Sequence, residues 1–240
     1  MEAPHSASDS QNTLAEDKNW SRGEIVRGEM AGLNYIVVEG AIGAGKTGLA
    51  QLLAEKFGAS LVLEEIEENP FLLDFYKNRK RFSFQTQVFF LLSRFKQQQG
   101  LLELDLFRTK VISDYLFWKD RIFASINLSQ KELYLYEKIL PILEKDIPRP
   151  DLVIYLQTSP EVLQKRIKEK GRDFEKGLDL EYISLLVESY NHFFFHYNLG
   201  NLLVVKNDNL NFQKNPSQFE DLLSIIKEEK PGTRYYVPAA

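Results

Sequence analysis

The chain has 240 residues, 44% of them apolar, which is enough material for one domain with a sizeable core. Its net charge of −4, from 30 basic and 34 acidic side chains, argues against a protein that coats nucleic acid by neutralising phosphates. The absence of cysteine excludes disulfides, thiolate metal sites and a cysteine nucleophile. No apolar run reaches the roughly 18 residues that a membrane helix needs. The N-terminus has no signal-peptide pattern, so we expect a cytoplasmic protein.

Strand-like and helix-like segments alternate along the chain after a polar stretch, residues 1–32, that is expected to be a flexible extension. The first apolar run begins at Tyr35, and four further β-branched or aliphatic runs lie near residues 59–65, 109–115, 151–157 and 201–207. Helical patterns begin near Thr47, Pro70, Phe82, Phe117, Ser129, Ser159, Asp179 and Pro216. The alternation predicts an α/β fold, a five-stranded parallel sheet flanked by helices on both faces. One domain is expected over residues 33–229, followed by a C-terminal tail over residues 230–240.

The first strand leads into a phosphate-binding loop. Its residues Gly40, Gly45, Lys46 and Thr47 match the pattern G-x-x-x-x-G-K-[ST] between a predicted strand and a predicted helix. In that setting backbone N–H groups converge on phosphate oxygens, and the glycines, with Gly43 among them, allow positive φ and close approach to the ligand. The lysine is expected to bridge the outer phosphates and the threonine to hold Mg²⁺.

A phosphate loop alone does not distinguish a kinase from a GTPase, a motor or a transporter ATPase. The sequence has neither the Asn-Lys-x-Asp motif of GTPases nor the long apolar strand ending in Asp-Glu of many ATPases. The residues that would bind the group receiving the phosphate must distinguish these classes. Within an apolar helical segment, residues 82–99, Gln87 and Arg94 lie two helical turns apart and therefore share a face.

Four later segments, together with the phosphate loop, resemble the deoxynucleoside kinase family, most closely its bacterial deoxyadenosine and deoxyguanosine kinases. They are LEEIEENPFLLDFY at residues 63–76, FSFQTQVFFLLSRFKQQ at 82–98, VISDYLFWKDRIFA at 111–124 and RIKEKGRDFEKGLDLEY at 166–182. The resemblance covers residues 35–226. It implies a P-loop kinase fold with a lid, and the ATP- and Mg²⁺-dependent transfer of the γ-phosphate to the 5′-hydroxyl of a deoxynucleoside in nucleotide salvage.

The resemblance also implies roles for residues on the acceptor side. Glu64 matches the family's base, by register against the downstream Asn69 and Pro70, whereas Glu67 and Glu68 fit a solvated acidic turn.

The nucleobase and sugar contacts follow from the same resemblance. Gln87, Arg94 and Asp120 match the residues at the nucleobase edge, and Asp120 is the carboxylate that Arg94 needs in apolar surroundings. A purely structural ion pair is the alternative for these two. Tyr76 and Glu175 match the pair that binds the 3′-hydroxyl of the sugar.

The metal site matches the family only in part. Asp114 ends the third predicted strand and is the implied partner of Thr47 in holding Mg²⁺. The family often has Arg and then Ser or Thr after this acid, whereas Tyr115 and Leu116 follow here. This departure removes a cation near the reacting phosphoryl group.

The donor side is implied by two further segments. Arg166, Lys170 and Arg172 match a lid over the triphosphate, with lysine at 170 where arginine is commoner, and Arg172 is expected, with Lys46, to act in catalysis. Asn211 and Phe212 are expected to hold the adenine of ATP.

We expect a purine deoxynucleoside kinase. The amide of Gln87 favours deoxyadenosine over deoxyguanosine, and deoxycytidine stays open. The alternatives are a nucleoside monophosphate kinase, which would need cations such as those of residues 79–81 near the acceptor, and a catalytically silent nucleotide-binding subunit of a larger assembly. The aromatic run YNHFFFHY at residues 190–197 indicates a subunit contact, so a homodimer is expected. No nucleic-acid or membrane partner is expected.

Overall fold

The computed structural model describes residues 32–103, 110–172, 175, 177–228 and 230–238 of the chain. Apart from Gly32, the extension expected over residues 1–32 lies outside this part. Within it, no helix is both long and apolar enough to cross a membrane.

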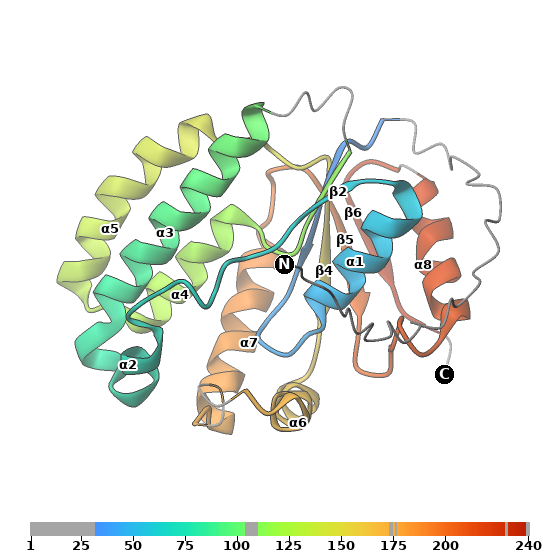
Figure 1. Cartoon of the computed structure of the whole chain (residues 1–240). Helices are drawn as coiled ribbons and strands as arrows, with labels where there is room; N and C mark the ends of the chain where they lie inside the picture. Colours follow the sequence, from blue (N-terminus) through green and yellow to red (C-terminus); the bar gives the residue numbers. More distant parts are fainter. Residues whose placement is uncertain (1–31, 104–109, 173–174, 176, 229, 239–240) are drawn as a thin grey trace, which may run out of the picture.

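A parallel sheet forms the centre of the fold, with its strands in the order β2-β3-β1-β4-β5-β6 (Figure 1). The strands are β1 Tyr35–Glu39, β2 Ser60–Val62, β3 Val111–Ser113, β4 Leu152–Gln157, β5 Asn201–Lys206 and β6 Thr233–Tyr236. Every residue of β1 and β3 is buried, as expected for central strands that are covered on both faces. The predicted parallel α/β sheet is confirmed.

The sheet has six strands, however, and not the predicted five. The additional strand, β6, comes from the segment that we expected to be a C-terminal tail, and it pairs in parallel with β5 at the edge of the sheet. Tyr236 is buried while Tyr235 is 70% exposed, which is the alternation of a half-buried edge strand. Its β-branched and aromatic residues were a usable signal, but the run is only four residues long and follows Pro231 and Gly232.

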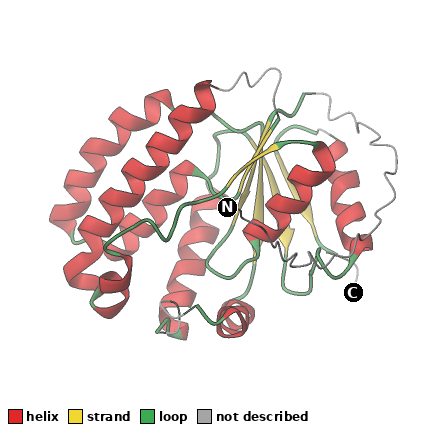
Figure 2. Cartoon of the chain, viewed as in Figure 1, coloured by secondary structure: helices red, strands yellow, loops and turns green. Residues whose placement is uncertain are grey.

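Helices cover both faces of the sheet (Figure 2). They are α1 Lys46–Phe57, α2 Leu72–Lys77, α3 Arg79–Glu103, α4 Asp120–Asn127, α5 Gln130–Leu143, α6 Pro160–Lys170, α7 Leu180–Phe195 and α8 Pro216–Lys227, with short 3-10 turns at Phe117–Lys119 and Glu144–Asp146. In Figure 1, α1 and α8 lie on one side of the sheet, and α3, α4, α5 and α7 lie on the other.

Local sequence signals set several helix ends. Gly45 adopts a left-handed conformation, φ 91°, directly before α1, and Gly58 ends the same helix in a similar conformation. Ser129 and Glu132 form a capping box at the start of α5, where the sequence predicted that a helix begins. These residues set where α1 begins and ends and where α5 begins.

The register of the sheet brings the carboxyl ends of β1, β3 and β4 to one edge. Val37 of β1 pairs with Ser113 of β3 on one side and with Val153 of β4 on the other. Because all these strands are parallel, their carboxyl ends lie at the same edge, which is where ligands bind in open α/β sheets. The phosphate loop and Asp114 follow these strands directly, so they meet there.

Candidate active site

A cavity of about 870 Å³ opens at this edge of the sheet, within the size range of ligand pockets. It extends from the phosphate loop and α1, past the end of α6, to the face of α3 that carries Gln87 and Arg94. Most of the residues singled out in the sequence line it: Gly43, Gly45, Lys46, Thr47, Glu64, Tyr76, Gln87, Arg94, Asp114, Arg166, Lys170, Arg172, Glu175, Asn211 and Phe212. Two do not, namely Gly40, which is buried at the start of the loop, and Asp120.

The phosphate loop has the backbone shape that its glycines allow. Gly43 and Gly45 have φ values of 85° and 91°, and a Cβ atom on Gly43 would lie 2.9 Å from Cγ1 of Ile167. The Lys46 ammonium lies over the loop and donates to the carbonyl of Gly40 at 2.8 Å. Burial and the nearby ammonium of Lys119 lower the pKa of Lys46.

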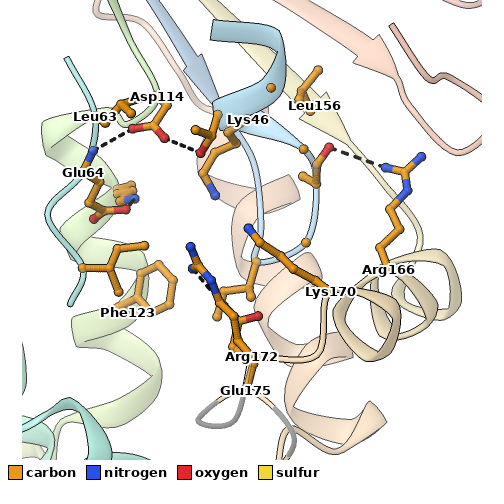
Figure 3. Close-up of a pocket in the computed structure, with 18 of the residues that line it drawn as sticks. Lys46, Leu63, Glu64, Asp114, Phe123, Leu156, Arg166, Lys170, Arg172 and Glu175 are labelled. Atoms are coloured by element: carbon orange, nitrogen blue, oxygen red, sulfur yellow. Dashed lines mark hydrogen bonds and ion pairs between the residues drawn. The ribbon is translucent and has the colours of Figure 1, made fainter. Parts of the chain in front are cut away.

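One carboxylate joins the phosphate loop to the acceptor side. Oδ2 of Asp114 accepts a hydrogen bond from the Thr47 hydroxyl at 2.5 Å, and Oδ1 accepts one from the backbone N–H of Glu64 at 2.8 Å (Figure 3). The Thr47 hydroxyl at the start of α1 and the Asp114 carboxylate after β3 are hard oxygen ligands of the kind that Mg²⁺ takes when phosphates and water complete its shell. The donor set therefore fits this ion.

Glu64 is held by two cations. Its Oε1 accepts from Nε and Nη2 of Arg94 at 2.8 and 2.5 Å, and its Oε2 accepts from Nζ of Lys119 at 2.6 Å. Burial alone would raise the pKa of Glu64, but the positive charges of Lys119 and Arg94 lower it well below its ordinary value. The carboxylate is thus ionised and is a weak proton acceptor, well suited to orient a hydroxyl group.

Asp120 does not reach the cavity, contrary to the expectation that it contacts the nucleobase directly. It is fully buried, with Oδ1 bound to Nη1 of Arg94 and Oδ2 accepting from the Tyr136 hydroxyl at 2.9 Å. The ion pair between Arg94 and Asp120 that the sequence predicted is therefore present, but only Arg94 lines the cavity. The sequence could not show this because helix periodicity gives the face of Arg94 and not the depth of its partner.

Gln87 is fixed by a hydrogen bond to Asp120, the first residue of α4. Its Nε2 donates to the backbone carbonyl of Asp120 at 3.0 Å. A carbonyl only accepts, so the amide nitrogen must face it, and the Oε1 acceptor of Gln87 is turned the other way. Gln87 lines the cavity beside Arg94.

Tyr76 and Glu175, the expected 3′-hydroxyl pair, both line the cavity although they come from α2 and from the segment after α6. Oε1 of Glu175 lies 3.5 Å from Nη1 of Arg172 (Figure 3). Burial raises the pKa of Tyr76 well above its ordinary value, so its hydroxyl stays protonated and can donate a hydrogen bond.

The three expected lid cations divide into two groups. In Figure 3, the side chains of Lys170 and Arg172 point toward Lys46 across the cavity. Arg166 instead binds backbone carbonyls: its Nη2 donates to Asn207 and Leu210 at 2.9 and 3.2 Å.

The second guanidinium nitrogen of Arg166, Nη1, lies 3.5 Å from the carbonyl of Ala44 (Figure 3). Arg166 therefore ties the phosphate loop to the segment that follows β5. That segment carries Phe212, which is buried, and Asn211, which is exposed and uses its side-chain oxygen to accept from the backbone of Lys214 at 3.1 Å.

Sequence reasoning missed several residues of the site, among them Lys119 and Gln213. Lys119 is 2% exposed, lines the cavity and binds Glu64. Gln213 also lines the cavity, and its Nε2 lies 2.9 Å from where a Cβ atom on Gly48 would be. A lone lysine after aromatic residues, or a lone glutamine in a loop, carries no pattern that marks it as a site residue.

Tyr115, which departs from the family pattern, is fully buried and does not line the cavity. Its hydroxyl accepts a hydrogen bond from Nε2 of Gln98 at 3.1 Å, on α3. The aromatic ring therefore belongs to the packing between β3 and α3.

Comparisons with known proteins agree with this geometry. A family model described as deoxynucleoside kinase matches residues 36–229. A deoxyguanosine kinase of Bacillus subtilis is 38% identical over 199 residues, which are 81% of this chain and 96% of the relative. A deoxyadenosine kinase of Dictyostelium discoideum is 36% identical over 71% of this chain and 70% of its own length. The solved deoxyadenosine kinase from M. mycoides, with the products dCMP and dCDP bound, has a TM-score of 0.69 and 27% identity, covering 79% of this chain and 98% of its own.

Proposed function

The chain belongs to the deoxynucleoside kinase family, and we propose that it uses ATP and Mg²⁺ to phosphorylate the 5′-hydroxyl of a purine deoxynucleoside in nucleotide salvage. The observation that carries this proposal is the pair of hydrogen bonds that Asp114 accepts, one from the Thr47 hydroxyl and one from the backbone N–H of Glu64. The loop that binds the donor and the carboxylate that orients the acceptor are thereby fixed in one frame. Positioning of this kind supplies most of the catalysis in phosphoryl transfer.

In the proposed reaction the 5′-oxygen forms a bond to the γ-phosphorus while the bond from that phosphorus to the β,γ-bridging oxygen breaks, which releases ADP. Glu64 accepts a hydrogen bond from the 5′-hydroxyl. Since its carboxylate is a weak base, Glu64 takes up the proton late, when the forming bond to phosphorus has made the hydroxyl acidic. Lys46 and Arg172 stabilise the negative charge of the transferring group. Bound Mg²⁺ would neutralise charge on the outer phosphates, held by Thr47 and Asp114.

We propose deoxyadenosine as the preferred acceptor. The anchored amide of Gln87 turns its Oε1 acceptor away from the Asp120 carbonyl, and an acceptor suits the 6-amino group of adenine. Arg94 retains N–H groups beyond those bound to Glu64 and Asp120, and these suit N7, which adenine and guanine share. Deoxyguanosine and deoxycytidine are the competing acceptors.

The surroundings of the acceptor end favour an uncharged alcohol over a nucleoside monophosphate. The cluster of Arg79, Lys80 and Arg81 does not line the cavity, and the Arg79 guanidinium lies 3.9 Å above the ring of Tyr182. Glu65, Glu67 and Glu68 line the cavity instead. Their negative charge repels a phosphate on the acceptor.

We further propose that the protein acts in the cytoplasm as a homodimer. The support for the homodimer is the aromatic run over residues 190–197, in which Phe195, at the end of α7, is 83% exposed. The molar mass in solution, measured by light scattering after size exclusion, tests this part.

A single assay tests the proposed activity. The protein is incubated with Mg-ATP and each of the four deoxynucleosides, and ADP and the deoxynucleoside monophosphate are quantified by chromatography. We expect equal amounts of the two products, the highest kcat/KM with deoxyadenosine, and no product from deoxyadenosine monophosphate. Glu64→Gln serves as the control and is expected to lower kcat by about 100-fold or more. Turnover of the monophosphate but of no deoxynucleoside would refute the proposal.

A further inference from the structure

Lys119 places a buried ammonium at the acceptor end of the cavity. It is the last residue of the 3-10 turn Phe117–Lys119 and is 2% exposed. Its Nζ donates to Oε2 of Glu64 at 2.6 Å and lies 4.0 Å from Oε2 of Glu39. A lysine is rarely buried without a paired charge, so two carboxylates determine where this ammonium lies.

Glu39 keeps Lys119 in register with the phosphate loop. This carboxylate is fully buried at the end of β1. It accepts from the backbone N–H of Gly40 at 2.8 Å, in the phosphate loop, and from that of Leu116 at 2.7 Å, in the turn that carries Lys119. Through these hydrogen bonds, Glu39 connects the turn that carries Lys119 to the phosphate loop.

The two oxygens of Glu64 are not equivalent. A carboxylate has about four lone-pair positions, two on each oxygen. Among the residues that the structure describes, Oε1 accepts two N–H groups of Arg94, and Oε2 accepts the single one of Lys119. The position that remains for an incoming hydroxyl is on Oε2, the oxygen that Lys119 holds.

From this geometry, and resting on the kinase activity proposed above, we propose that Lys119 is a positioning residue for phosphoryl transfer: it holds Oε2 of Glu64 toward the acceptor hydroxyl. Arg94 fixes the other oxygen, so the two cations clamp the carboxylate in one orientation. Without Lys119, Glu64 can rotate about its terminal torsion, and the buried Glu39 loses its nearest cation.

The expected effect is a loss in the chemical step with little change in binding. Lys119→Met is expected to lower kcat by about 100-fold, as for a displaced acid–base group, while KM for ATP and for deoxyadenosine stays within about threefold. Lys119→Arg keeps the charge and is expected to recover at least about tenfold of that loss. Lys131→Met removes an exposed lysine of α5 that does not line the cavity, and it should leave kcat and KM unchanged.

A double-mutant cycle with Glu64→Gln separates positioning from a general structural role. If Lys119 acts through Glu64, Lys119→Met lowers kcat by less than about twofold in the Glu64→Gln background, because the group that it positions has already been changed. The proposal would be overturned if Lys119→Met lowered kcat by the same factor in the Glu64→Gln background as in the wild type. It would also be overturned if the Lys119→Met enzyme kept kcat within threefold of the wild type.

Two further measurements keep the test decisive. Circular dichroism melts establish that each variant is folded. If Lys119→Met alone does not fold, Lys119→Arg decides: kcat well above that of Glu64→Gln supports the proposal, and kcat equal to it refutes the proposal. A wild-type protein that phosphorylates no deoxynucleoside would refute the proposed function itself, an outcome distinct from any result confined to the variants.

Discussion

Asp120 offers the sharpest test of how the acceptor end is organised, because it acts entirely through other residues. It is fully buried and does not line the cavity, and its two oxygens are bound to Nη1 of Arg94 and to the hydroxyl of Tyr136. Asp120→Asn preserves shape and volume and removes the charge. The buried Arg94 then keeps one carboxylate partner, Glu64, in place of two.

The magnitude follows from these contacts. Breaking a buried ion pair by removing one charge costs about 3–5 kcal/mol, and the lower end applies here because the asparagine oxygen still accepts from Arg94. The bond to Tyr136 persists, since its hydroxyl can turn to accept from the new amide. A loss of about 3 kcal/mol in a chain of this size lowers Tm by about 6–12 °C. Because Arg94 also loses part of its orientation, we expect kcat/KM for deoxyadenosine to fall by about tenfold.

Thermal unfolding followed by circular dichroism, with steady-state kinetics on the same preparation, measures both quantities. Tyr136→Phe removes only one hydrogen bond to the carboxylate and is expected to cost about 1.5 kcal/mol, about half as much. Asp146→Asn, an exposed aspartate in the turn after α5, is the control for loss of a negative charge and should leave Tm unchanged. If Asp120→Asn kept Tm within 2 °C and kcat/KM within threefold of the wild type, then Arg94 would not depend on Asp120, and this account of the nucleobase end would be wrong.

Two further predictions concern the sugar and the lid. Wild-type enzyme should use 2′,3′-dideoxyadenosine at least about 100-fold less efficiently than deoxyadenosine, because Tyr76 and Glu175 would be left without the 3′-hydroxyl. Tyr76→Phe should shrink this ratio by about tenfold, and equal use of both sugars by the wild type would remove the pair from this role. Lys170→Arg should lower KM for ATP by about threefold, because a guanidinium binds phosphate through a planar fork. The same exchange at Lys168, which is exposed and does not line the cavity, should have no effect, and equal shifts in both variants would refute the lid assignment.

The parts of the fold and site that the sequence predicted are those with local physical causes. The phosphate loop is a run of consecutive residues, so its spacing alone specifies the turn and the helix start. Thr47 and Asp114 could be expected to meet because one begins the helix after a parallel strand and the other ends the neighbouring strand, whereas Glu64 was placed beside them by the family resemblance. A strand end determines position to within a few ångströms, and this is enough to predict that side chains meet.

The parts that the sequence did not predict depend on side-chain direction and burial depth. Arg166 lines the cavity, and its role over the triphosphate stays a prediction, but the sequence did not indicate that its guanidinium donates to the carbonyls of Asn207 and Leu210. Sharing a helix face with Lys170 did not distinguish these outcomes, because a long side chain can reach in several directions from one Cα position. Asp120 was expected in the cavity for a similar reason, and its burial depends on Tyr136, a residue of another helix.

At Tyr115 the chain lacks the arginine of the family pattern, but Lys119 still places a cation beside Glu64. Position 115 carries no cation, and read along the chain this leaves the acceptor end short of positive charge. In three dimensions the 3-10 turn after β3 brings Lys119 back to the cavity, where its ammonium meets Glu64, while the ring of Tyr115 packs against α3. Charge balance in a buried site depends on which groups reach it and not on their order in sequence. A search of this family for the cation near Glu64 should therefore include the turn after the third strand as well as the residue that follows Asp114.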